Sequence, residues 1–253
     1  MEKKVAMVTG AGTGVGKGIA LSLADEGYTL VIHYNSSAAG AEAVCREIRQ
    51  KGGEAAAIQA NLADPHGYQK LFEEFDKLFH RLDVFVYNYG VNYHVPILEL
   101  EEDKFDELAM VNWRSAYFCI QQAANRMRDF GNGGNIIAIT SAHQEKVGSA
   151  SYGSLKATLA RMIQNTALEY AKYNIRANTL APGLTRNGAE RQSNGKLEQM
   201  AEEVPLKRCA EPDEMGAAVV FFCSDACDCV TGATLMADGG DVLLSQRKEE
   251  YGL

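Results

Sequence analysis

Long apolar runs and basic clusters are absent from this sequence. Hydrophobic residues make up 46% of its 253 residues, but no apolar run approaches the roughly 18 residues that a membrane span needs. Near the N-terminus, Thr9 and Gly10 interrupt the apolar stretch before it reaches the length of a signal peptide. The 25 basic residues, outnumbered by 33 acidic ones, are spread along the chain and form no footprint for nucleic acid or membrane. We therefore expect a cytoplasmic protein with neither of these partners.

Cysteine spacing is unsuited to metal binding. Six cysteines occur, of which Cys223, Cys227 and Cys229 lie close together. However, no C-x-x-C pair is present, and no histidine follows at the spacing of a zinc site. We expect no metal, and free thiols in a reducing compartment.

Strand-like and helix-like segments alternate along the chain, with no internal repeat, low-complexity run or linker. Strands are predicted at 4–9, 29–34, 54–60, 82–87, 135–140, 175–180 and 234–237. Helices are predicted at 15–26, 40–51, 66–79, 104–130 (one or two helices), 151–173 and 212–223. Strict alternation with near-continuous apolar strands predicts a parallel sheet covered by helices on both faces. Right-handed crossovers then give an α/β, doubly wound parallel sheet (a Rossmann fold) in a single domain, 1–253.

Residues 184–211 interrupt this alternation. The segment is polar and lacks a strand, although 195–203 has a helical pattern. Long irregular insertions in compact domains are often functional, so we interpret 184–211 as a substrate lid. The alternative is an ordinary excursion with short helices.

A glycine cluster joins the first predicted strand to the first helix, with the sequence Thr9-Gly-Ala-Gly-Thr-Gly-Val-Gly16. Glycines allow a tight turn and let the backbone approach a ligand, and a helix N-terminus attracts a pyrophosphate. The pattern predicts a dinucleotide site, the alternative being a glycine-rich loop without a ligand. Its binding residues would be Gly10, Gly12, Thr13, Gly14, Val15 and Gly16.

The end of the second predicted strand bears on which nucleotide is bound. An acidic residue there would bind the ribose hydroxyls of NAD, but none occurs between Leu30 and Ser37. His33, Asn35, Ser36 and Ser37 can donate hydrogen bonds to a 2′-phosphate. NADP(H) is therefore favoured, and NAD(H) stays possible because the stretch lacks arginine, the usual phosphate partner.

Tyr152 and Lys156 lie four residues apart on a predicted helix and so share a face. An ammonium within about 4–6 Å lowers the pKa of an acid by roughly 1–3 units. From its ordinary value near 10, the pKa of Tyr152 would approach neutrality, where a phenol exchanges a proton with a carbonyl or alcohol. The alternative is an ordinary surface pair.

Together these motifs resemble the short-chain dehydrogenase/reductase family in its single-domain form, over essentially the whole chain. Further marks are Asn88-Tyr89-Gly90, Asn112, Ser141, Asn178, Pro182-Gly183 and Asp238-Gly239-Gly240. The resemblance implies that Tyr152 is the general acid/base, that Lys156 lowers its pKa and holds the nicotinamide ribose, and that Ser141 bonds the substrate oxygen. It implies that Asn112 holds a water linking Lys156 to solvent. It extends the cofactor-binding set to Asn61, Leu62, Asn88, Gly90, Tyr152, Lys156, Pro182 and Gly183.

Three features depart from the family pattern. Tyr89 replaces a small residue beside the cofactor, and Asn61 stands where an aspartate commonly meets the adenine amine. Only ten residues separate Ser141 from Tyr152, which is short for the family. Thr140 is therefore the alternative to Ser141.

Residues of mixed chemistry follow the strand ends on the substrate side: His143, Gln144, Tyr93, His94 and Leu184. They allow sugars, polyols, ketones or acyl chains, or are ordinary loop residues. Residues 141–146 faintly resemble the loop of glucose 1-dehydrogenases, and the chain also resembles 3-oxoacyl-ACP reductase-like members.

The sequence thus predicts an NADP(H)-dependent oxidoreductase that interconverts a carbonyl (ketone, aldehyde, sugar or 3-oxoacyl group) and an alcohol of a small-molecule substrate. Alternatives are a non-catalytic NADP-binding sensor or scaffold, an NAD-dependent sugar or polyol dehydrogenase, and an epimerase or dehydratase on the same fold. Helices 113–130 and 151–173 are apolar on more than one face. In the family these helices pack between subunits, so we expect a homodimer or homotetramer.

Overall fold

The computed structural model describes residues 3–93, 95–146, 150–186 and 196–244. These residues form a seven-stranded sheet in the order β3-β2-β1-β4-β5-β6-β7, with every neighbouring pair parallel. The strands are β1 (Val5–Val8), β2 (Thr29–Tyr34), β3 (Ala55–Gln59), β4 (Val84–Tyr87), β5 (Gly134–Ile139), β6 (Ile175–Pro182) and β7 (Thr234–Ala237). The chain reverses its direction of winding between β1 and β4, where doubly wound sheets bind ligands. The predicted single-domain Rossmann fold is confirmed.

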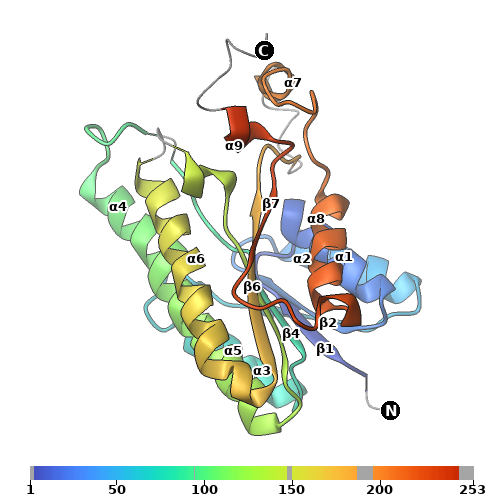
Figure 1. Ribbon diagram of the computed structural model, residues 1–253. Coiled ribbons are helices and arrows are strands. Elements are labelled where there is room, and N and C mark those ends of the chain that lie inside the picture. The colour runs from blue at the N-terminus through green and yellow to red at the C-terminus, as the bar shows by residue number, and fades with distance from the viewer. Residues whose placement is uncertain (1–2, 94, 147–149, 187–195, 245–253) are drawn as a thin grey trace.

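Helices cover both faces of the sheet (Figure 1). The α-helices are α1 (Gly14–Asp25), α2 (Ala38–Gln50), α3 (Gly67–Leu78), α4 (Glu102–Ala109), α5 (Ala116–Phe130), α6 (Ala150–Tyr170), α7 (Lys196–Ala201), α8 (Pro212–Cys223) and α9 (Asp241–Leu244). One core lies between the sheet and α1, α2 and α8, and a second lies between the sheet and α3, α5 and α6. The short helices α7 and α9 lie beyond the carboxyl end of β7 (Figure 1).

The strands are apolar because both of their faces are buried. Along β1, Val5 and Met7 join the core on the α5 side, whereas Ala6 and Val8 join the core on the α1 side. Successive side chains of a strand point to opposite faces, so no position of a doubly covered strand is left for a solvated polar residue. This burial accounts for the continuous hydrophobic runs in the sequence.

Helix α1 is held against α8 by a very close backbone approach. A Cβ added to Gly18 would lie only 2.3 Å from the carbonyl oxygen of Pro212, the first residue of α8. No side chain fits there, so the glycine lets the two helices touch. The contact fixes the N-terminus of α1, which faces the carboxyl edge of the sheet.

The predicted helical stretch 104–130 contains a change of winding. Helix α4 continues into a π-helix, η1 (Met110–Ser115), which leads directly into α5. Single π-turns within α-helices are often found at functional sites, and this one includes Asn112. In the part of the chain that the structure describes, no helix combines the length and the apolar character that crossing a membrane requires.

Candidate active site

A cavity of about 1360 Å³ lies at the carboxyl edge of the sheet, where β1, β2, β4, β5 and β6 end. The structure brings most of the predicted site residues together on its walls. These are Gly10, Gly12, Thr13, Gly14, Val15, Gly16, Asn35, Ser36, Asn88, Gly90, Ser141, Tyr152, Lys156, Pro182 and Gly183. The cavity therefore contains both the glycine turn and the Tyr–Lys pair.

The glycine turn is shaped by left-handed backbone and by bonds to the end of β4. Gly10 and Gly14 have φ of +64° and +54°, a region that favours glycine. A Cβ at Gly16 would lie 2.4 Å from the carbonyl oxygen of Gly10, so the helix start packs directly on the turn. The hydroxyl of Thr9 accepts the N–H of Asn88 at 2.9 Å, and the amide of Asn88 donates back to the carbonyl of Thr9 at 2.9 Å. The ends of β1 and β4 are thereby locked together.

The end of β2 forms a wall of neutral hydrogen-bonding groups. Tyr34, Asn35, Ser36 and Ser37 line the cavity there, and Ser37 is the N-cap of α2. Neither α1 nor α2 has an acidic residue in its first turn. Two helix N-termini without acids and a glycine turn open to close approach suit the phosphates of a dinucleotide.

His33 does not face the cavity, so its predicted contact with a 2′-phosphate is wrong. The side chain is fully buried. Its Nδ1 accepts the N–H of Gly10 at 3.1 Å, and its Nε2 lies 3.0 Å from the carbonyl oxygen of Ala60. These partners select the neutral imidazole with its proton on Nε2. Burial lowers the pKa of His33 to about 4, and the ring supports the glycine turn from behind.

Two further predicted cofactor residues lie off the cavity wall. Asn61 is exposed, and its side-chain oxygen accepts the N–H of Ala63 at 3.0 Å. The side chain of Leu62 is fully buried in the core, and its carbonyl accepts the hydroxyl of Ser115. The Leu62 side chain therefore faces the core, and contact of Asn61 or of the Leu62 backbone with the cofactor stays a prediction.

Tyr152, Lys156 and Ser141 form one polar cluster. The Lys156 side chain is only 2% exposed, and its Nζ donates to the carbonyl of Ile139 at 2.9 Å. The same Nζ lies 5.5 Å from the centroid of the Tyr152 ring. The hydroxyl of Ser141 lies close enough to that of Tyr152 to act on its acidity. Thr140, the alternative to Ser141, instead donates to the carbonyl of Leu180 at 3.3 Å, so Ser141 is the better placed of the two.

The acidities in this cluster differ from the prediction. Burial raises the pKa of Tyr152 to about 12, and the nearby Ser141 hydroxyl opposes this rise only in part. Burial also lowers the pKa of Lys156 to about 8. The expected lowering of the Tyr152 pKa by Lys156 is therefore wrong for this structure. Loss of hydration disfavours the charged form of each group, and the ammonium binds the Ile139 carbonyl.

Asn112 is fully buried and lies behind the cavity wall, not on it. Its amide group donates to the carbonyls of Val91 and Leu108 at 2.9 and 3.2 Å, and its oxygen accepts the N–H of Val91 at 3.3 Å. It thus clamps the loop that follows β4. A Cβ at Gly90 would lie 2.7 Å from the Asn112 oxygen and 3.3 Å from Lys156 Nζ, so both groups pack closely on the Gly90 backbone.

The structure places only some of the candidate substrate residues on the cavity wall. His143 and Leu184 line the cavity, whereas Tyr93 and Gln144 are not among its described lining residues. The hydroxyl of Tyr93 donates to Glu107. His94 lies outside the described residues. The half-buried ring of Tyr89 lines the cavity and packs against Gly10 and, edge to face, against His33.

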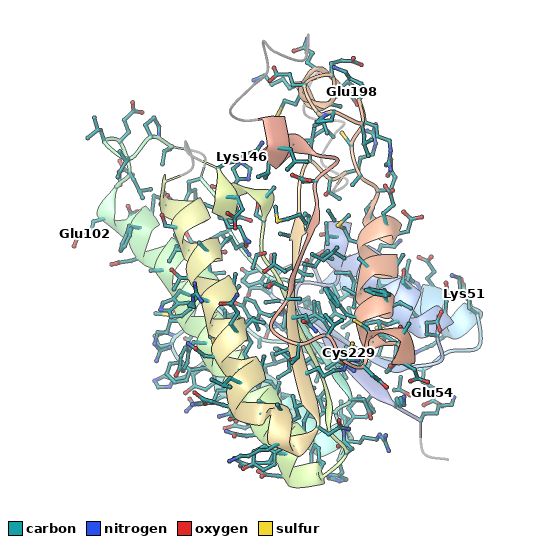
Figure 2. The ribbon with its side chains drawn as sticks, in the orientation of Figure 1. Lys51, Glu54, Glu102, Lys146, Glu198 and Cys229 are labelled. Carbon is teal, nitrogen blue, oxygen red and sulfur yellow. The ribbon has the colours of Figure 1, made fainter. Side chains whose placement is uncertain are left out.

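Several cavity residues belong to no sequence motif: Tyr34, Val91, Asn92, Ile139, Ala142, Lys146, Thr185, Lys196, Leu197, Met200, Glu203, Val204 and Asp241. The residues from 185 to 204 lie in the predicted lid, so the irregular pattern of that segment was the sequence feature that pointed to them. Lys146 pairs with Asp241 in α9, although 95 positions separate the two. Figure 2 shows Lys146 beside α9 and well away from Cys229. No local pattern could have revealed this pair.

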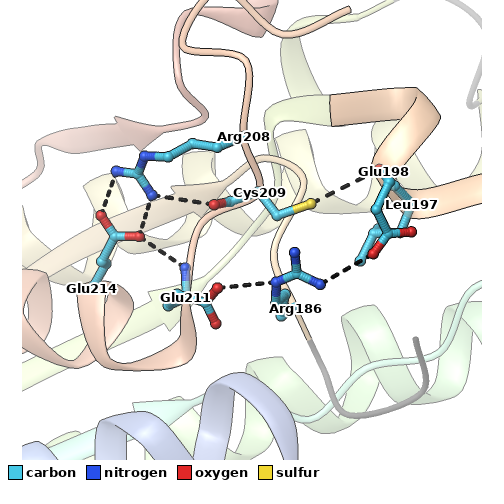
Figure 3. A network of polar contacts seen from close by, with 7 residues as sticks. All are labelled: Arg186, Leu197, Glu198, Arg208, Cys209, Glu211 and Glu214. Atoms are coloured by element: carbon cyan, nitrogen blue, oxygen red, sulfur yellow. Dashed lines mark hydrogen bonds and ion pairs between the residues drawn. The ribbon is translucent and has the colours of Figure 1, made fainter. Parts of the chain in front are cut away.

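The two arms of the predicted lid are fastened to each other where they leave the body of the protein. Thr185 and Ala210 form a parallel bridge, with the N–H of Ala210 bonded to the carbonyl of Leu184 at 2.8 Å. The guanidinium of Arg186 reaches Glu211 at 3.0 Å and Glu198 of α7 at 3.4 Å (Figure 3). Residues 187–195 lie outside the described part of the chain, and a lid function for 184–211 stays a prediction.

Among the described residues, no group of three or more His, Cys, Asp or Glu side chains is arranged to hold a metal ion. Burial raises the pKa of Cys223 to about 12. Its thiol therefore keeps its proton at neutral pH, and a thiolate is the form that binds metals.

Comparisons with known proteins agree with this geometry. A family model described as enoyl-(acyl carrier protein) reductase matches residues 10–241. The 3-oxoacyl-(acyl-carrier-protein) reductase FabG of Staphylococcus epidermidis is 34% identical over 240 residues, which cover 94% of this chain and 98% of that protein. The L-rhamnose 1-dehydrogenase (NAD(P)(+)) of a Sphingomonas species is 34% identical over 245 residues, covering 95% and 96%. A crystal structure of 3-oxoacyl (acyl-carrier-protein) reductase from Agrobacterium tumefaciens C58 with NADP bound has a TM-score of 0.87 at 27% identity, covering 93% of each chain.

Buried His33 makes stability sensitive to acid. Its pKa is about 4 in the folded chain against 6.5 ordinarily, so the unfolded chain binds the extra proton between these values. The stabilisation is complete above pH 6.5 and is lost as the pH falls through 4. Between pH 7 and 4.5 we expect His33 to account for a loss of about 2.5 kcal/mol in the free energy of unfolding.

Urea unfolding of the wild type and of His33→Asn at both pH values measures this contribution. Asparagine retains an acceptor for the Gly10 N–H but does not titrate, so the variant should lose less stability on acidification. His80→Asn, at an exposed position, is the matched control and should lose as much as the wild type. Equal losses in all three proteins would contradict the prediction.

Proposed function

Because the chain belongs to the short-chain dehydrogenase/reductase family, we propose that it uses NADP(H) to interconvert a carbonyl and an alcohol, with Tyr152 as the general acid/base. The observation that carries the proposal is the polar cluster of Tyr152, Ser141 and Lys156 on the wall of the cavity that also contains the glycine turn. The ketone, aldehyde, sugar or 3-oxoacyl group to be reduced would lie in this cavity, between the polar cluster and the glycine turn.

The two hydroxyls give the reacting oxygen its partners. Ser141 and Tyr152 are neighbours on the cavity wall, so one oxygen atom can approach both. When bound, the nicotinamide supplies the hydride to the carbonyl carbon or accepts it from the alcohol carbon. In the reductive direction Tyr152 gives its proton to the carbonyl oxygen and becomes a tyrosinate, while Ser141 stabilises the charge that develops on that oxygen.

Lys156 would act on the tyrosinate more than on the resting tyrosine. With a pKa of about 8, it carries its charge at neutral pH. A cation near the Tyr152 ring stabilises the anion that proton donation leaves behind. Lys156 and Asn112 both pack closely on Gly90, and we propose that a water held by these two side chains returns the proton to Tyr152.

NADP(H) rather than NAD(H) is favoured by the wall at the end of β2. Asn35, Ser36 and Ser37 offer neutral donors there, and the first turn of α2 contains no acid to repel a 2′-phosphate. The Agrobacterium reductase is described with NADP bound. The Sphingomonas dehydrogenase is named for both nucleotides, which agrees with the lack of an arginine clamp here.

A homo-oligomer is supported by apolar side chains on the outer faces of α5 and α6. Leu168 is 82% exposed and Tyr117 is 40% exposed. We propose that a second copy of the chain covers these helices. In sedimentation equilibrium, the wild type should form a dimer or tetramer, and Leu168→Glu should dissociate it because the interface would bury a charge. Leu78→Glu, at an exposed position on α3, is the control; a monomeric wild type would exclude the assembly.

Tyr152→Phe tests the proposed chemistry. The variant loses only the hydroxyl, so turnover of a ketone, aldose or 3-oxoacyl thioester panel with NADPH should fall by about 10²–10⁴-fold. Binding of NADPH, followed by its fluorescence, should persist. Tyr68→Phe, a tyrosine stacked on Phe118 away from the cavity, should retain wild-type turnover. If Tyr152→Phe kept full activity, the proposed role of Tyr152 would be wrong; a wild type that binds NADPH but turns over nothing would favour a sensor or scaffold.

Asn35→Asp tests the cofactor assignment. The substitution preserves size and adds one negative charge where the 2′-phosphate is expected. Repulsion at close range should raise the KM for NADPH by about 10–100-fold, whereas the KM for NADH, which lacks that phosphate, should change little. Steady-state kinetics with both nucleotides gives the comparison within one variant. A wild-type preference for NADH, or equal effects on both nucleotides, would count against NADP(H).

A further inference from the structure

We infer that His143 is a positioning residue that controls which way the Ser141 hydroxyl points, and so makes the support of the substrate oxygen depend on the protonation state of an imidazole. The inference rests on the proposed roles of Ser141 and Tyr152 and deepens them. It arises from contacts of His143 that the proposed chemistry does not use.

Among the described residues, the hydroxyl of Ser141 makes two contacts, both with His143. The backbone N–H of His143 donates to Ser141 Oγ at 3.2 Å. The ring Nδ1 of His143 lies 3.1 Å from the same oxygen. A serine hydroxyl has one proton and two lone pairs. The two contacts with His143 therefore decide whether the Ser141 proton is left for a substrate oxygen.

The state of Nδ1 decides where the single proton of Ser141 goes. A bare Nδ1 can only accept, so it draws the Ser141 proton toward the ring and away from the substrate. A protonated Nδ1 can only donate. It then fills one lone pair of Ser141 Oγ while the His143 backbone N–H fills the other, and the Ser141 proton is released toward the oxygen shared with Tyr152. Protonation of His143 thus converts Ser141 into a donor to the reacting oxygen.

The ring is held in place by the shape of the backbone. His143 belongs to the short 3-10 helix η2 (Ala142–Glu145), which packs directly on α6. A Cβ at Gly153 would lie 2.5 Å from the His143 carbonyl oxygen, so glycine permits this approach. The His143 ring then meets the Tyr152 ring edge to face, with centroids 6.1 Å apart and an interplanar angle of 75°.

The charged and titratable groups near the ring come from three elements. Helix α6 contributes Tyr152 and Lys156, and the segment of His143 itself contributes Glu145 and Lys146. Helix α9 contributes Asp241, whose charge is paired with that of Lys146. The cation of Lys156 opposes an imidazolium, whereas the carboxylate of Glu145 favours one. None of these groups replaces the contact between Nδ1 and Ser141.

Nitrogen NMR of the ring tests the hydrogen-bond pattern without a substrate. The chain has five histidines, and the signals of His143 are assigned by their loss in His143→Asn. We expect the neutral ring to have a bare Nδ1 and its proton on Nε2, and we expect the Nδ1 shift to change in Ser141→Ala. A neutral ring with its proton on Nδ1 would overturn the inference, because Nδ1 would then donate at every pH.

The pH dependence of turnover tests the consequence. Asparagine at position 143 can present an acceptor oxygen near the position of Nδ1 but never takes up a proton. In the wild type, kcat for reduction of ethyl acetoacetate with NADPH should rise as the pH falls through the imidazole range near 6.5, by about tenfold or more if one donor to the oxyanion is gained. In His143→Asn, kcat should stay at the lower level without that inflection, and KM should change little.

His80→Asn, at an exposed site, is the control and should keep the wild-type profile. An inflection unchanged in His143→Asn would overturn the inference. Tyr152→Phe distinguishes a failure of the role of His143 from a failure of the proposed function. If that variant is inactive while His143→Asn behaves as wild type, only the role of His143 fails; if Tyr152→Phe is active, the proposed function itself fails.

Discussion

A buried ammonium at the end of β5 is the interaction on which the site depends. Lys156 is almost without solvent contact and donates to the carbonyl of Ile139. A buried charge needs a polar partner, and the last carbonyl of a parallel strand can supply one at the sheet's edge. The bond therefore fixes α6 against β5. Tyr152, one helical turn before Lys156, is placed over the cavity by the same anchor.

The glycine turn is joined to the Tyr152–Lys156 pair through the adjacent strands β1 and β4. The Thr9–Asn88 bonds join the glycine turn to the loop after β4, and Asn112 clamps that loop from beneath. Gly90, at the end of this chain of contacts, lies next to Lys156. Hydrogen bonds and close packing thus join the glycine turn to the Tyr152–Lys156 pair, although 136 positions separate Gly16 from Tyr152.

Sequence patterns predicted the alternation of elements, the glycine turn and the Tyr–Lys pair because each is a local consequence of spacing. They failed where burial decides. His33 ends a strand covered on both faces, so a polar residue there turned inward to bind Gly10 and Ala60. The spacing of Tyr152 and Lys156 indicated that the two side chains are close, but not that they are buried. Burial raises the pKa of Tyr152, whereas the prediction was that Lys156 lowers it. The π-turn that contains Asn112 was not predicted either, and the role of Asn112 stays a prediction. The Lys146–Asp241 pair joins distant segments and leaves no periodic trace.

The bridge between Thr185 and Ala210 joins the two ends of the predicted lid, residues 184–211, close to where they leave the sheet and enter α8. The chain departs after β6 and comes back before α8 at neighbouring points, which backbone bonds and the Arg186–Glu211 pair hold together. A loop whose ends are already joined adds little closure entropy when its length changes. The segment between these two points can therefore change in length with little cost to the stability of the sheet or to the placement of Tyr152 and Lys156.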